Sequence, residues 1–132
     1  ADETLFDFLF NAIELLDQQE DGLDVFHLCF LLRLTRFLGF YPDTSLAASA
    51  PYFDLKSGSY ALDLPMHTQV LHQPHAKFWT TLLNARFSQL IDLNIPAADR
   101  RILLDKVILY YQLHVDGLGE IKSYDIMKEV FN

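Results

Sequence analysis

The chain has 132 residues, of which 51% are apolar and 21% are charged, and its formal net charge is -8. This much apolar surface can offset the chain entropy that folding removes, so the composition excludes an intrinsically disordered chain. The single cysteine, Cys29, excludes an intramolecular disulfide framework and a metal site built from several cysteines. We therefore expect one folded domain over residues 1–132 in a reducing compartment, the cytoplasm.

The negative charge is concentrated at the start of the chain. Residues 1–24 contain eight acids and no base, whereas the remaining residues contain ten acids and ten bases. A net charge of -8 repels phosphate backbones at long range, so we do not expect this domain to carry a main DNA-binding surface. No apolar stretch approaches the roughly 20 residues of a membrane span, and no membrane association is expected. The chain opens Ala-Asp-Glu without a methionine, which we interpret as a piece of a longer protein.

Apolar residues recur at steps of three and four along most of the chain, which predicts helices. Asp24 is placed to cap a buried helix that ends at Gly39, and Pro96 suits the first turn of a later one. The segments predicted to be helical are 4–18, 23–38, 78–91, 96–115 and 123–131.

Residues 42–74 have a different composition, with four prolines and several small residues, which predicts an irregular connector. Two short aromatic pieces on either side of Lys56-Ser57-Gly58 indicate a small β-hairpin, and we expect Phe53, Leu55 and Tyr60 to dock on the helices. The predicted fold class is therefore all-α, a compact bundle of about five helices with a connector that contains the hairpin.

Few residues have the spacing that a metal site or a catalytic site requires. His67, His72 and His75 could in principle hold zinc, but they lie in a proline-interrupted connector with no cysteine nearby. Cys29 sits in the most apolar predicted helix, where a thiolate is disfavoured. We therefore predict no metal, no cofactor and no catalytic site, and interpret the chain as a non-enzymatic protein.

Two groups of basic residues have two interpretations each. Arg33 and Arg36 lie on one side of an otherwise apolar helix, where a guanidinium either pairs with an acid of the same chain or binds an external carboxylate or phosphate. Arg100, Arg101 and Lys106 form either an ordinary solvated face or a contact with a partner or with DNA.

Several strings of the sequence, read in order, resemble the C-terminal helical domain of the RecO family of bacterial DNA repair and recombination mediators, most closely its zinc-less members. A typical example is Leu34-Thr35-Arg36-Phe37-Leu38-Gly39-Phe40, which is similar to the family's Leu-x-Arg-x-Leu-Gly-aromatic string. The other matching strings, spread over nearly the whole chain, are Leu5-Phe6-Asp7-Phe8, Phe26, Pro42, Tyr52-Phe53-Asp54-Leu55 with Gly58 and Tyr60, Tyr110-Tyr111-Gln112-Leu113-His114, and Ile121-Lys122-Ser123.

The resemblance implies an interaction and scaffold domain. Family members join an N-terminal oligonucleotide-binding fold, absent from this chain, to a helical domain. They anneal single strands and act with RecR on strands coated by single-strand DNA-binding protein, so that recombinase can load. The family's four-cysteine zinc site is not transferred, because no cysteine lies between Phe40 and Pro74. DNA contact is expected mainly from the absent domain.

The resemblance also implies a partner site. The helical domain of the family can receive the acidic and apolar tail of single-strand DNA-binding protein. Arg36 matches the family string and is the first candidate for the tail carboxylate, with Lys122 and Arg33 as further candidates. The alternative function is an all-α ligand-binding or dimerisation domain of a bacterial transcription regulator, in which the aromatic residues would line a pocket.

Overall fold

The computed structural model describes residues 24–115. Helices and strands follow along the chain in the order α2 (Val25–Leu38), β1 (Tyr52–Asp54), β2 (Ser59–Ala61), β3 (Val70–Leu71), α3 (His75–Asn84), the 3-10 helix η1 (Phe87–Asp92) and α4 (Ala97–His114). The helices predicted over residues 4–18 and 123–131 lie outside the described residues.

Helix α2 begins and ends where its capping residues predict. The Asp24 carboxylate accepts a hydrogen bond from the His27 backbone N–H (3.1 Å), and the His27 ring accepts one from the Asp24 backbone N–H (3.2 Å). Gly39 has φ 93°, the left-handed conformation that ends a helix at little cost only in glycine. Seven of the 14 residues are buried, which confirms the prediction of a buried helix.

The connector contains a three-stranded antiparallel sheet with strand order β2-β1-β3. The predicted hairpin forms, since Phe53 pairs with Tyr60 in register, and β3 then adds to the free edge of β1 through Leu71. The all-α class is therefore wrong: in the described residues three α-helices pack with a sheet. A strand of two residues, Val70 and Leu71, both buried, is too short to show the alternation that reveals a strand in sequence.

The single helix predicted over residues 78–91 is also wrong. Helix α3 stops at Asn84, because Ala85 and Arg86 adopt extended backbone conformations, and η1 then starts at Phe87. The Gln89 side chain accepts a hydrogen bond from the Arg86 backbone N–H (2.9 Å) and so stabilises the new start. A 3-10 helix repeats every three residues, so its apolar spacing continues that of α3 without marking the break.

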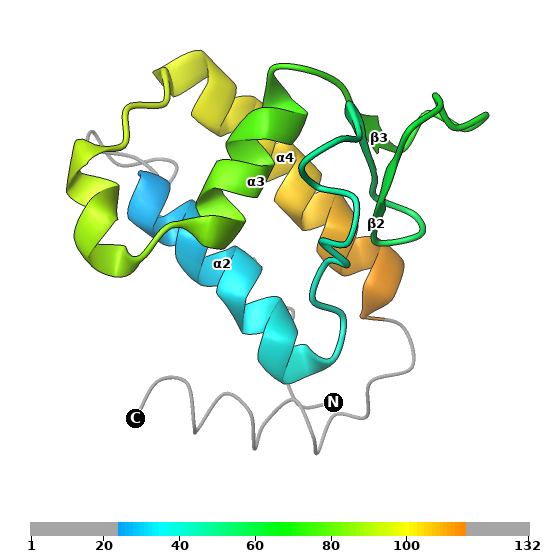
Figure 1. Cartoon of the computed structure of the whole chain (residues 1–132). Helices are drawn as coiled ribbons and strands as arrows, with labels where there is room; N and C mark the ends of the chain where they lie inside the picture. Colours follow the sequence, from blue (N-terminus) through cyan, green and yellow to red (C-terminus); the bar gives the residue numbers. More distant parts are fainter. Residues whose placement is uncertain (1–23, 116–132) are drawn as a thin grey trace.

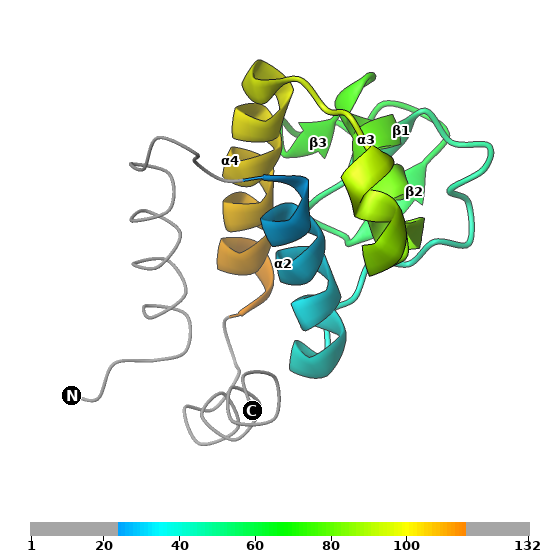
Figure 2. The same cartoon turned by 90° about the vertical axis from the view of Figure 1, so that its left-hand side faces the viewer.

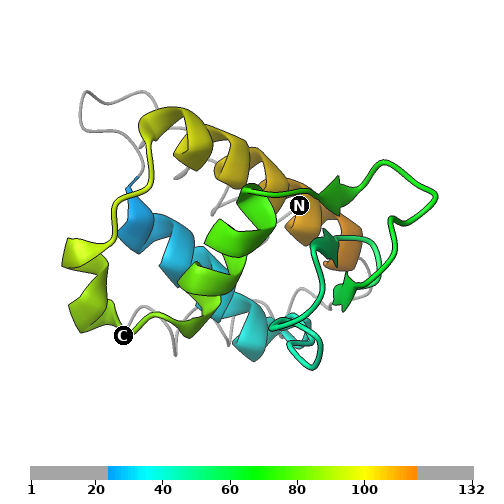
Figure 3. The ribbon, with the colours of Figure 1, turned by 45° about the horizontal axis from the view of Figure 1, so that its top comes forward.

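The helices form one core with the sheet at one end (Figure 1). Helix α2 contacts both α3 and α4, and Figure 2 shows α2 and α4 side by side. In Figure 3 the sheet and η1 lie at opposite ends of the molecule. Phe53 of β1 is fully buried against Trp79 of α3 and Tyr110 of α4. The hairpin therefore docks on the helices, as predicted, and the sheet closes one end of the core.

Candidate functional site

Three of the strings that carry the family resemblance, at residues 34–40, 52–60 and 110–114, meet in space. The Tyr110 hydroxyl donates a hydrogen bond to the carbonyl oxygen of Phe40 (2.5 Å), which is the aromatic residue after Leu38-Gly39. The Phe40 ring packs against the rings of Tyr110, Tyr111 and His114. Burial raises the pKa values of Tyr110 and Tyr111 well above the usual value for tyrosine. This cluster joins the end of α2 to the last turns of α4.

The hairpin also contacts the last turns of α4. The His114 ring nitrogen Nε2 lies 2.7 Å from the carbonyl oxygen of Leu55, so this nitrogen carries the proton. Gly58 has φ 77°, and a Cβ atom there would lie 3.2 Å from the Tyr110 hydroxyl oxygen. The resemblance strings at residues 34–40, 52–60 and 110–114 thus form one structural unit around Tyr110.

Arg36 lies on the surface at the last turn of α2. Its guanidinium carbon is 4.3 Å from the centre of the Tyr41 ring, a cation–π contact that fixes the charge over an aromatic face. The Tyr41 hydroxyl lies 3.5 Å from the carbonyl oxygen of Leu83, which ties this ring to α3. Phe37, the next residue, is 56% exposed. Within residues 24–115 the Arg36 guanidinium makes no ion pair.

Arg33 is half-buried and bonds within the domain. Its guanidinium donates to the carbonyl oxygen of Ala85, just after the end of α3, and its Nε donates to the sulfur of Cys29 (3.3 Å). The Cys29 thiol is fully buried and lies 3.5 Å from the Leu82 carbonyl oxygen. Arg33 therefore links α2 to the end of α3, whereas Arg36 points a charge outward. Lys122 lies outside the described residues.

The three connector histidines are separated from one another. His67 Nε2 is 3.0 Å from the Asp54 carboxylate, and His75 Nε2 is 3.0 Å from the Asp99 carboxylate. His72 is exposed and its ring stands edge-on to Tyr52. In the described part of the chain, no three histidine, cysteine or acidic side chains are grouped as metal ligands would be.

The basic residues of α4 do not form one surface of free charge. Arg100 is half-buried and its guanidinium donates to the carbonyl oxygen of Ile95 (2.8 Å), which fastens the start of α4. Arg101 is exposed and has an interaction partner, and Lys106 is half-buried. Only part of this group faces solvent.

A groove of about 790 Å³ lies beside α3, and no pattern in the sequence predicts it. Its walls come from α3, η1, residues 47–51 and Tyr60 of β2, which are far apart in the chain. Small apolar side chains line much of it, and the charged residues on it are Lys77 and Asp92. We call it the α3 groove; its lining includes Ala47, Ala48, Ala50, Ala76, Ala85 and Leu93.

The chain is similar to known proteins of one family. The family model "Recombination protein O C terminal" matches residues 1–125. The DNA repair protein RecO of Flavobacterium johnsoniae is 39% identical over 133 residues, covering 98% of this chain and 53% of the relative. That of Azobacteroides pseudotrichonymphae is 30% identical over 132 residues, covering 100% and 55%. That of Flavobacterium psychrophilum is 34% identical over 131 residues, covering 98% and 53%. No solved structure gives a significant match.

The chain therefore belongs to the RecO C-terminal domain family, as its sequence strings predicted. It spans about half the length of the RecO relatives that it matches. No helix in residues 24–115 is long and apolar enough to cross a membrane.

Proposed function

We propose that this chain is the interaction and scaffold domain of a recombination mediator that acts in DNA repair without being an enzyme. The observation that carries the proposal is the family match over residues 1–125. In the proposed protein, single-strand annealing and recombinase loading with RecR occur on DNA coated by single-strand DNA-binding protein. Most of the DNA contact comes from the oligonucleotide-binding fold that precedes this domain. A regulator of transcription would belong to a different family, and the family match does not support that reading.

We place the docking site for the tail of single-strand DNA-binding protein at Arg36. A carboxylate is bound best by a guanidinium with no competing acid, and Arg36 makes no ion pair within residues 24–115. Tyr41 holds the Arg36 guanidinium in place from one side, and Phe37 offers an exposed ring to an apolar side chain of the tail. Arg33 supports this site by holding α2 against α3.

The experiment is a fluorescence titration of a labelled tail peptide with the full chain. Arg36→Ala is expected to weaken binding about tenfold or more, because a charge-assisted contact to a carboxylate is lost. Arg86→Ala, which removes an exposed arginine of the turn between α3 and η1, is the matched control and should bind as the wild type does. Equal affinity of a folded Arg36→Ala variant and the wild type would remove Arg36 from the site.

A further inference from the structure

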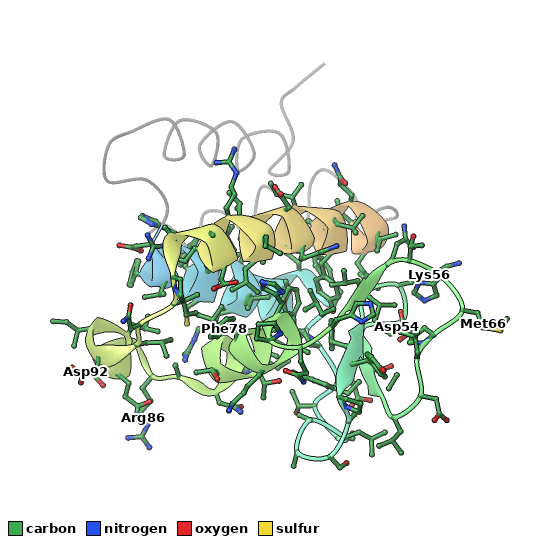
Figure 4. The ribbon with its side chains drawn as sticks, turned by 90° about the horizontal axis from the view of Figure 1, so that it is seen from above. Asp54, Lys56, Met66, Phe78, Arg86 and Asp92 are labelled. Carbon is green, nitrogen blue, oxygen red and sulfur yellow. The ribbon has the colours of Figure 1, made fainter. Side chains whose placement is uncertain are left out.

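The segment between β2 and β3 carries exposed apolar side chains on a protruding loop. Leu62 and Leu64 are 56% and 54% exposed, and Met66 is fully exposed. Figure 4 shows Met66 at the far end of this loop, pointing away from the rest of the protein. We call residues 62–66 the apolar loop. Apolar side chains gathered on an exposed protrusion are typical of a contact surface.

The base of the apolar loop is fixed. The His67 ring is 3.0 Å from the Asp54 carboxylate, and the Leu55 backbone N–H donates to the carbonyl oxygen of Gln69 (3.0 Å). The loop is thus held in place at the sheet end while its three apolar side chains face water. A partner that covers them gains apolar burial and loses little loop entropy, because the base is already ordered.

The α3 groove has the properties that such a loop requires. Its volume of about 790 Å³ is large enough for several side chains, and small alanine side chains leave its floor open. Lys77 lies on the groove, and Asp63 lies between the two leucines of the apolar loop. Within residues 24–115 neither charge has an ion-pair partner. The two surfaces are therefore complementary in polarity and in charge.

We propose that the apolar loop of one copy docks in the α3 groove of a second copy, with Asp63 beside Lys77. Because loop and groove are different surfaces of one chain, two copies that exchange loops form a closed dimer with two-fold symmetry, whereas one-way docking is head-to-tail and extends a row. Asp92, on the η1 side of the groove, repels Asp63 and so favours the orientation toward Lys77. This inference uses neither Arg36 nor the tail, and it goes beyond the proposed function.

Sedimentation velocity of the full chain over a concentration series tests the proposal. The wild type is expected to associate as concentration rises. Asp63→Lys and Lys77→Asp each place like charges together and should weaken association about tenfold. The double variant, and an equal mixture of the two single variants, should restore it because the opposite charges meet again. Both substitutions are on exposed side chains, so the folds should match by circular dichroism.

A second variant checks the apolar part of the contact. Leu64→Ser combined with Met66→Ser should weaken association without changing the charge. Arg36→Ala is the control that separates this inference from the proposed function, since it should lose the tail and keep self-association. A wild-type chain that stays monomeric at millimolar concentration would overturn the proposal, and so would association that ignores the charge reversals at Asp63 and Lys77.

Discussion

The Tyr110 hydroxyl donates a 2.5 Å hydrogen bond to the carbonyl oxygen of Phe40, 70 residues earlier in the chain. This bond joins the end of α2 to α4 at the point where the hairpin also packs. Tyr110→Phe removes the donor and leaves a carbonyl oxygen without its partner, which should lower the free energy of unfolding by about 1–3 kcal/mol. Urea denaturation of the full chain measures this. Tyr52→Phe is the control, because the Tyr52 hydroxyl makes no hydrogen bond in the described residues; equal midpoints for the two variants would show that the bond contributes nothing.

Gly58 and Gly39 both have positive φ, yet they differ in what surrounds them. A Cβ at Gly39 meets nothing within 4 Å, so Gly39→Ala should cost only the backbone strain, about 1–2 kcal/mol. At Gly58 the same strain is joined by a contact of 3.2 Å with the Tyr110 hydroxyl. We expect Gly58→Ala to be the more destabilising of the two in thermal unfolding. Combining Gly58→Ala with Tyr110→Phe should cost less than the sum of the two changes, and strict additivity would contradict this contact.

Asp54 makes the stability of the fold depend on pH in the acidic range. Burial raises the pKa of Asp54, but hydrogen bonds from the Ser57 N–H, from the His67 ring and from the Lys56 N–H outweigh it, and the pKa is lowered overall. A lowered pKa in the folded state gives stability that is present above the unfolded value, near 4, and is lost as pH falls through the folded value. Unfolding free energy measured from pH 6 downward should fall less steeply in Asp54→Asn than in wild type. Equal slopes for Asp54→Asn and the wild type would contradict this role of Asp54.

The buried tyrosines predict that the fold also loses stability at alkaline pH. Burial raises the pKa of Tyr60, Tyr110 and Tyr111 in the folded state. Their contribution is complete below the unfolded pKa of about 10 and is lost as pH rises toward the folded values, because the unfolded chain loses those protons first. Tyrosinate absorbance followed beside circular dichroism should show these three residues titrating only as the fold is lost. A folded chain in which all six tyrosines have ionised would contradict this account.

Local signals account for the parts that the sequence predicted. Asp24, Gly39 and Pro96 act on their own helix ends, and the Lys56-Ser57-Gly58 turn acts on its own hairpin, so each is visible in a short stretch of chain. Strand β3 pairs with β1, and the end of α3 coincides with the hydrogen bond from Arg33 to the Ala85 carbonyl. Those are contacts between distant segments, which apolar spacing does not encode.

The candidate site also has one part that the sequence predicted and another that depends on contacts between distant segments. The family string made Arg36 the first candidate for the site. The spacing of the sequence alone does not show that Arg36 faces solvent over Tyr41 whereas Arg33 bonds to the Ala85 carbonyl. Both fit the spacing of three on one helical side, and only the position of α3 distinguishes them. The α3 groove could not be predicted at all, because its walls come from several distant segments whose packing is tertiary.

A double-mutant cycle decides whether Arg36 binds the terminal carboxylate of the tail. Tail peptides with a free and with an amidated carboxyl terminus are titrated against wild type and against Arg36→Ala. Amidation should weaken binding to the wild type about tenfold and should leave binding to Arg36→Ala unchanged, because the carboxylate and the guanidinium act as a pair. Amidation that weakens binding equally in both proteins would contradict the account.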